Sequence, residues 1–352
     1  MKLRFILFLR RMFLLCMNFL IYGAGAVGSL VGGQLALAGY AVTFLARPHV
    51  VEAVCKDGLR IVEAANESRV LHFHITSDPA DALSDPRPDL VVFTMKAYDT
   101  RAALAELQSV TSNPPPVLCL QNGVGIEAEI ASALSSERVI PGIVTTAVQM
   151  PEPGRVIVER ARGIGVAAGH PMSARILDAL AGAGFAVREY PDPAAMKWSK
   201  LLINIVANAT SAITGLSAGA IFAHPGLYGF EIEALREGVR VIRGMGLRPV
   251  DLPGVRSALL ARAVFLPPVL IRPLLARVVA TGRGEKMPSF YSDLERGKSE
   301  VAWLNGAIVA EGQRLGIPVP ANSRLTEVLT GLVEGRYQRE TFRGKPEALV
   351  AH

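Results

Sequence analysis

The chain contains 352 residues, half of them apolar and 6% aromatic, with a formal net charge of +6. This length predicts two globular domains rather than one small core, and scattered lysines and arginines with few aromatic residues argue against a nucleic-acid-binding surface. Three widely spaced cysteines, Cys16, Cys55 and Cys119, argue against a disulfide framework or a zinc site and are typical of a protein from a reducing cytoplasm.

The N-terminal segment, residues 1–16, is basic and apolar. Arg10 and Arg11 divide its apolar stretch into pieces too short to span a bilayer, and no small-residue cleavage site precedes the strand that follows. We therefore expect a non-structural extension and no membrane contact, with peripheral attachment as the alternative. The folded domain is expected to begin at Met17.

Residues 17–191 alternate short apolar runs with helical stretches. Residues 19–22 are predicted to form the first strand and residues 27–38 the first helix, followed by the strand-like runs AVTFLAR, DLVVFTM and PVLCLQN. Continuous apolar runs that alternate with helices indicate parallel strands covered on both faces. The predicted fold is therefore α/β, with a Rossmann-type doubly wound sheet.

After Pro193 the pattern changes to long helical runs such as AAMKWSKLLINIVANATSAI. We expect a mostly helical domain over residues 192–335 and a polar, frayed tail over residues 336–352. No metal site is predicted. His72 and His74 alternate in a predicted strand, where a solvent-facing pair is the simpler interpretation.

The stretch FLIYGAGAVGS carries the GxGxxG spacing, with Gly23, Gly25 and Gly28 between a predicted strand and a predicted helix. In that context the first glycine permits a tight turn, the second lets the backbone approach a pyrophosphate, and the third lets the helix pack closely against the strand. We expect this turn to bind a dinucleotide, the alternative being a glycine turn without a ligand. The predicted cofactor-binding residues of the turn are Gly23, Ala24, Gly25, Ala26, Val27 and Gly28.

The residue after the second predicted strand indicates which dinucleotide binds. Folds that prefer NAD carry an acid about 20 residues beyond the glycines, which binds the ribose 2′-hydroxyl. Here Arg47 lies in that position, in VTFLARPH, and an arginine can bind a 2′-phosphate through charge-assisted hydrogen bonds. The sequence therefore favours NADPH, with an ordinary surface arginine as the alternative.

Lys96 and Asn122 end two further apolar runs, VVFTMK and VLCLQN. In open parallel sheets the ligand crevice lies beyond the carboxyl ends of the strands, so we expect both side chains to lie near Gly23 in one cleft. Either residue alone would be an ordinary turn residue, and their shared position favours a binding role.

In the helical domain, the segment WSKLLINIVANAT places Lys200, Asn204 and Asn208 on one face of a predicted helix whose other residues are mostly apolar. Because buried polar groups are costly unless paired, we expect a functional face, in which the lysine donates to a carbonyl oxygen and the amides hold the substrate. A narrow solvent-facing stripe is the alternative. Glu300 begins a later apolar helix with Ser299 before it, and helix capping explains this acid as well as a site does.

Six segments resemble, in order, the signature segments of the 2-dehydropantoate 2-reductase (ketopantoate reductase) family: GAGAVGS, LAR, TMKAYDT, VLCLQNGVG, WSKLLINIVAN and SEVAWLNGAIV. The resemblance covers residues 17 to about 330. It implies an NADPH-binding Rossmann domain joined to a helical domain, and reduction of the 2-keto group of ketopantoate in pantothenate synthesis.

The resemblance also implies a role for each matching residue. Lys200 corresponds to the general acid, and Asn122 would contact both cofactor and substrate. The other implied substrate contacts are Asn204, Asn208 and Ser289, and the other cofactor contacts beyond the glycine turn are Arg47 at the 2′-phosphate, Lys96 at a ribose, and Glu300.

The chain departs from the family pattern on the substrate side. A family asparagine after Asn208 is replaced by a small residue near Ala218, and the spacing from Ser289 to Glu300 is one residue shorter than the pattern. The keto acid therefore stays open, with another small 2-keto acid as the alternative substrate. A non-catalytic NADPH-binding sensor is the alternative function, against which the Lys200 face argues, and a homodimer is left open.

Overall fold

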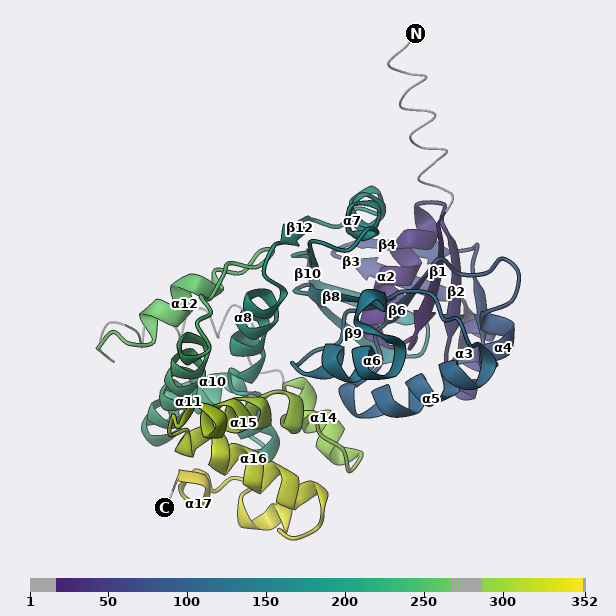
Figure 1. The fold of residues 1–352 in the computed structure, drawn as a ribbon. Coiled ribbons are helices and arrows are strands. Elements are labelled where there is room, and N and C mark those ends of the chain that lie inside the picture. Colours follow the sequence, from purple (N-terminus) through teal and green to yellow (C-terminus); the bar gives the residue numbers. More distant parts are fainter. Residues whose placement is uncertain (1–16, 268–270, 272–286, 351–352) are drawn as a thin grey trace. The chain divides into compact units, whose positions relative to one another are not determined.

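The computed structural model describes residues 17–267, 271 and 287–350, so the predicted extension over residues 1–16 lies outside the described residues. The chain divides into two compact units (Figure 1). Unit 1 comprises the chain up to Gln121 together with residues 126–196 and 252–255. Unit 2 comprises residues 122–125, 197–251 and the chain from Arg256 onwards.

Unit 1 is built on an eight-stranded sheet with the order β12-β11-β8-β7-β6-β1-β2-β5. Neighbouring strands are parallel except for β8 and β11, which are antiparallel. These parallel pairs confirm the predicted α/β class. The strands are β1 (Asn18–Tyr22), β2 (Ala41–Leu45), β5 (His74–Thr76), β6 (Leu90–Phe93), β7 (Val117–Cys119), β8 (Val139–Val144), β11 (Ile164–Ala167) and β12 (Val187–Tyr190).

The central strands form because their residues are apolar on both faces. All four residues of β6 are buried. This is expected for a continuous apolar strand in a sheet that helices cover on both faces. The helices of this unit are α2 (Ala26–Leu37), α3 (Pro48–Asp57), α4 (Pro79–Ala82), α5 (Thr100–Val110), α6 (Ile126–Leu134) and α7 (Ser173–Gly182), with short 3₁₀ turns η1 (Ala97–Asp99) and η2 (Ser136–Arg138).

A second sheet in unit 1, which the sequence did not distinguish, has the order β4-β3-β10-β9. Helix α2 lies between the two sheets. A Cβ at Gly32 would come within 2.5 Å of the Phe44 ring on β2, and one at Gly33 within 2.8 Å of Ile61 on β3. The strands of this sheet are β3 (Leu59–Glu63), β4 (Asn66–Val70), β9 (Ala147–Glu152) and β10 (Arg155–Arg160).

Unit 2 is helical, as predicted, and packs around one apolar core. Helix α8 runs across the boundary between the units, which falls between Met196 and Lys197. The helices are α8 (Pro193–Ile205), α9 (Asn208–Thr214), α10 (Ala218–Ala223), α11 (Pro225–Gly244), α12 (Ser257–Ala263), α14 (Ser289–Glu295), α15 (Asn305–Leu315), α16 (Pro320–Val333) and α17 (Pro346–Val350), with 3₁₀ turns η3 (Val301–Trp303) and η4 (Arg339–Thr341).

A buried glutamate of α11 caps the start of another helix. Glu237 is 0% exposed, and its carboxylate accepts the backbone N–H groups of Ala321 and Asn322, at 2.8 and 2.9 Å, in the first turn of α16. The Asn322 side chain donates to the same carboxylate at 2.6 Å. Burial raises the pKa of Glu237, although these three bonds oppose the shift.

Residues 336–350 of the C-terminal tail are folded and not frayed, contrary to the expectation from the polar composition of the tail. Phe342 and Leu349 are buried in the core of unit 2. Arg324 of α16 donates to the carbonyl oxygen of Ala348 in α17 at 3.1 Å, which joins the last helix to the rest of the unit. Tyr337, Ala348 and Val350 also pack against this core, so a few apolar side chains in a mostly polar segment are enough to fold it against the unit.

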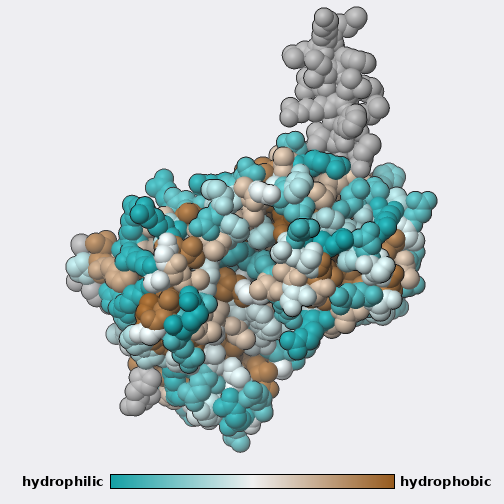
Figure 2. All heavy atoms as spheres, in the orientation of Figure 1, coloured by the Kyte–Doolittle hydropathy of each residue, from teal (hydrophilic) through white to brown (hydrophobic). Residues whose placement is uncertain are grey.

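The surface is mixed in character. On the face shown in Figure 2, hydrophilic residues surround scattered hydrophobic ones. In the part of the chain that the structure describes, none of the helices combines the length and the apolar character that crossing a bilayer requires. Among the described residues, the large apolar side chains most exposed to solvent are Leu37, Leu71, Val110, Leu259, Phe265 and Leu266.

Candidate active site

The glycine turn after β1 is shaped by close contacts at two of its three glycines. Gly23 has φ +104°, and a Cβ there would come within 2.8 Å of the Met95 nitrogen. A Cβ at Gly28 would overlap the Gly23 carbonyl oxygen, which also accepts a hydrogen bond from Thr94 Oγ1 at 2.7 Å. The protein itself therefore requires glycine at both positions.

Gly25 differs, because a Cβ there would meet no atom of the described residues within 4 Å. It precedes α2 as the N-cap residue, without a side-chain cap, and no acidic residue lies in the first turn of the helix. The backbone N–H groups at a helix start lack intrahelical partners, and together with the helix dipole they favour an anion. Open space above Gly25 at this helix start fits a pyrophosphate group.

Arg47 and Asp99 meet beside this turn. Arg47 follows β2, and Asp99 ends the 3₁₀ turn η1 that follows β6, so the two come from the strands that pair with β1 on either side. Arg47 Nη2 donates to Asp99 Oδ2 at 2.9 Å, with 66% of the arginine side chain exposed. An acid at this position was not predicted, although it lies in the quoted segment TMKAYDT.

Two further side chains that sequence reasoning missed hold the loop carrying Lys96. Gln121 Nε2, just beyond β7, donates to Thr100 Oγ1 at 2.8 Å and to the Met95 carbonyl oxygen at 3.2 Å. Lys96 itself is half-buried and precedes η1. Thr94 Oγ1 binds the Gly23 carbonyl oxygen, and Gln121 binds the Met95 carbonyl oxygen. The two side chains therefore hold the two backbone segments that lie close together at Gly23 and Met95. In the sequence, the role of Thr94 and Gln121 is indicated only by their position just beyond apolar strands.

In unit 2, the side chains of Asn122 and Asn204, both predicted to contact the substrate, lie side by side. Asn204 Nδ2 donates to Asn122 Oδ1 at 3.1 Å. The loop of Asn122 is held by Trp303, whose carbonyl oxygen accepts the Val124 N–H at 3.0 Å. Gly123 has φ +99°, and a Cβ there would come within 2.7 Å of the Trp303 Cβ, so only glycine fits.

Helix α8 exposes a narrow face. From Ala195 to Ile205 its residues are buried except for Lys200, Ile203 and Asn204, which are half-buried. Their spacing places them on one side of the helix, so Lys200 and Asn204 are accessible on a helix that is mostly buried.

The predicted single helix through Asn208 is wrong, because the chain breaks after α8. Ala207 adopts a left-handed conformation with φ +54°, and Asn208 begins the new helix α9. Glu231 on α11 accepts the Ala207 N–H at 2.8 Å and a hydrogen bond from Thr210 Oγ1. This buried carboxylate, distant in sequence, stabilises the break.

Asn208 is therefore placed with Ser289 rather than on the face of Lys200. Its Oδ1 accepts the Phe290 N–H at 3.1 Å, and Asn208 is buried while Ser289, the first residue of α14, is exposed. Glu300 is 2% exposed and precedes η3. Glu300 is the N-cap residue of this 3₁₀ turn and the next α-helix begins only at Asn305, so the predicted helix start at Glu300 is wrong. Ser299 Oγ accepts the Val301 N–H at 3.1 Å.

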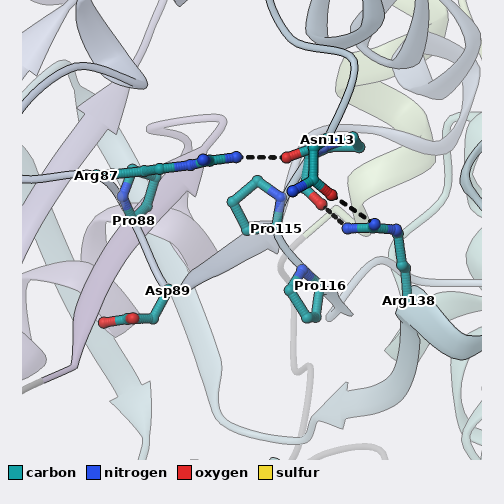
Figure 3. A pocket seen from close by; sticks show the side chains of 8 residues that line it. Arg87, Pro88, Asp89, Asn113, Pro115, Pro116 and Arg138 are labelled. Carbon is teal, nitrogen blue, oxygen red and sulfur yellow. Dashed lines mark hydrogen bonds between the residues drawn. The ribbon is translucent and has the colours of Figure 1, made fainter.

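A hollow of about 310 Å³ lies at the N-terminal ends of β6, β7 and β8 (Figure 3). The predicted cofactor-binding residues of unit 1 follow the carboxyl ends of their strands, so the hollow lies at the other end of the sheet. Arg87 donates to the Asn113 carbonyl oxygen at 2.5 Å, and Arg138 donates to Asn113 Oδ1 at 2.6 Å. Prolines 88 and 114–116 and Asp89 complete its lining. None of the residues predicted to bind cofactor or substrate belongs to it.

Comparisons with known proteins cover both units. The model of the family described as "Ketopantoate reductase PanE/ApbA" matches residues 19–168, and that of its C-terminal region matches residues 192–333. A 2-dehydropantoate 2-reductase of Archaeoglobus fulgidus is 32% identical over 90% of this chain and 97% of its own length. One of Pyrococcus horikoshii is 29% identical over 87% and 94%.

Solved structures agree with this fold. The crystal structure of a PanE/ApbA family ketopantoate reductase from Ralstonia eutropha superposes with a TM-score of 0.77, at 31% identity over 91% of this chain and 99% of its own. D-Mandelate dehydrogenase with NADH and anilino(oxo)acetate has a TM-score of 0.71 at 21% identity, over 91% and 99% of the two chains. This second similarity concerns the fold alone.

Proposed function

The chain belongs to the ketopantoate reductase family, and on this premise we propose that it reduces the 2-keto group of ketopantoate to a hydroxyl with NADPH. The family makes it an oxidoreductase. One observation in each unit supports the proposal: in unit 1 a glycine turn with open space at Gly25, and in unit 2 an accessible lysine, Lys200, beside an amide on a largely buried helix. The product, pantoate, would enter pantothenate synthesis.

Residues of unit 1 would hold the cofactor, which supplies a hydride when bound. The N–H groups of Ala26, Val27 and Gly28 at the start of α2 would bind the pyrophosphate. Arg47 would bind the 2′-phosphate and Lys96 a ribose, as donors at the carboxyl ends of β2 and β6. Thr94 and Gln121 would keep these loops in place through their bonds to the backbone.

Residues of unit 2 would hold the keto acid and move the proton. Asn122 and Asn204 would contact the substrate together, since their side chains already share a hydrogen bond. As the hydride adds to C2, negative charge develops on the former carbonyl oxygen, and protonated Lys200 would donate a proton from Nζ to it. Water would then return a proton to the lysine.

The other predicted contacts take supporting positions in this scheme. Asn208 and Ser289 would contact the substrate from the junction of α9 and α14. Glu300, buried before η3, would contact the cofactor. The Asn208 Oδ1 already accepts a backbone N–H, so its side-chain NH₂ is the group left to offer a ligand.

The test is NADPH oxidation by the purified protein with ketopantoate beside pyruvate, 2-ketoisovalerate and benzoylformate. We expect the highest kcat/KM with ketopantoate. If kcat/KM were tenfold higher with another keto acid, that acid would be assigned as the substrate in place of ketopantoate. The proposed reductase chemistry would still hold. NADPH binding without turnover of any keto acid would instead support the sensor alternative.

A further inference from the structure

The ion pair between Arg47 and Asp99 places a carboxylate on the arginine expected to hold the 2′-phosphate. Asp99 Oδ2 is 2.9 Å from Arg47 Nη2, and the aspartate side chain is 26% exposed. Both residues lie beyond the carboxyl ends of strands that pair with β1, the strand that leads into the glycine turn. The carboxylate is therefore part of the predicted cofactor surface of unit 1.

A carboxylate in this place affects the two nicotinamide cofactors in opposite ways. The 2′-phosphate of NADPH carries a charge near −2, so it must share Arg47 with Asp99 and lies close to a like charge. The ribose 2′-hydroxyl of NADH carries no charge and can donate a hydrogen bond to a carboxylate, which is the role an acid has in NAD-binding folds. The same surface thus offers a partner to each cofactor.

We propose that Asp99 is a specificity-determining residue that limits the preference for NADPH and lets the protein use NADH as well. This inference rests on the proposed function, because it takes the glycine turn and Arg47 as the cofactor site. Asp99 acts through its charge: it occupies one donor of Arg47 and repels the phosphate. The remaining guanidinium N–H groups are still able to bind a 2′-phosphate.

The Asp99→Asn variant tests this charge, because it keeps the size of the side chain and an oxygen that can accept from Arg47. We expect the Kd for NADPH, measured by calorimetry at low salt without substrate, to fall roughly three- to tenfold. The Kd for NADH should stay the same or rise. Glu52→Gln is the matched control, since it removes the same charge from an exposed position of α3 and should leave the ratio of the two Kd values within about twofold.

The outcomes separate this proposal from the proposed function. An unchanged Kd ratio in Asp99→Asn, or an equal weakening of both cofactors, overturns the role of Asp99. The same shift in Glu52→Gln also overturns it, because any surface charge would then suffice. A raised NADPH preference in Asp99→Asn alone supports it, even if the protein turns over no ketopantoate. If neither cofactor binds the wild-type protein, both proposals fail.

Discussion

Substituting Gly25 by alanine separates the role of the glycine turn in folding from its role in binding. A Cβ at Gly25 meets no atom of the described residues within 4 Å, and the residue has φ −80° and ψ −169°, which alanine adopts without strain. A Cβ at Gly28 would instead overlap the Gly23 carbonyl oxygen, which cannot move without displacing the turn. The two variants should therefore fail in different ways.

The expected magnitudes follow from these contacts. In Gly25→Ala, the lower entropy of the unfolded chain stabilises by about 0.4–1 kcal/mol, and the poorer N-cap residue destabilises by a similar amount, roughly 0.5–1 kcal/mol. Folding stability should therefore stay nearly constant. A bound pyrophosphate would have to move away from the added methyl group and lose at least one charge-assisted hydrogen bond, about 1.5–3 kcal/mol, or roughly 10- to 150-fold in Kd. Gly28→Ala should lower stability by about 1–3 kcal/mol through overpacking.

The measurements are NADPH titration by calorimetry and urea unfolding, on wild type, Gly25→Ala, Gly28→Ala and the control Gly229→Ala. Gly229 lies inside α11 of unit 2, and a Cβ there also meets no atom of the described residues within 4 Å. The Kd for NADPH should therefore stay near that of wild type, and stability should rise by about 0.5–1 kcal/mol, because alanine is favoured over glycine inside a helix. An unchanged Kd for NADPH in Gly25→Ala would refute the conclusion that a phosphate approaches this backbone. A large loss of stability in the same variant would show that the space above Gly25 is not open.

Further substitutions test the remaining features. Lys200→Met should lower kcat on the order of 10²–10³ with an unchanged Kd for NADPH, and near-normal turnover would remove the lysine from the mechanism. Arg47→Ala should weaken NADPH about 10-fold or more and NADH little, and equal effects on both would contradict a 2′-phosphate contact. Because burial raises the pKa of Glu237, the folded protein binds that proton more tightly than the unfolded chain. The unfolding free energy of wild type relative to Glu237→Gln should therefore be highest at low pH and fall as the pH rises above 4.5, the ordinary pKa of this group, in urea titrations; a constant difference would refute this. Phe342→Ala should destabilise by about 3–5 kcal/mol, whereas a frayed tail would tolerate it.

The sequence predicted those features that depend on local pattern. Strand β1, the glycine turn and α2 lie where the apolar run and the GxGxxG spacing placed them, and the contacts of Gly23 and Gly28 give the physical reason for both glycines. Burial of α8 around an accessible Lys200 and Asn204 also followed from the apolar residues between them.

Features that depend on distant residues could not be predicted in the same way. Alanine favours helices, and the break at Ala207 is imposed by Glu231, 24 residues further along the chain. The pairing of β3 with β10 joins segments far apart in sequence, so no local pattern reveals the second sheet. Phe342 lies between the polar residues Thr341 and Arg343, and only the core into which it packs shows that this part of the tail is folded.

Helix α11 also constrains the order in which unit 2 can form. Glu231 and Glu237 cap the starts of α9 and α16 from the same helix, across 24 and 84 residues of chain. Until α11 has docked, the first N–H groups of α16 can be satisfied only by water, and forming such distant contacts requires closing a long loop. We therefore expect α16 to be completed late in folding, with its N-terminal amides exchanging with solvent until Glu237 is in place.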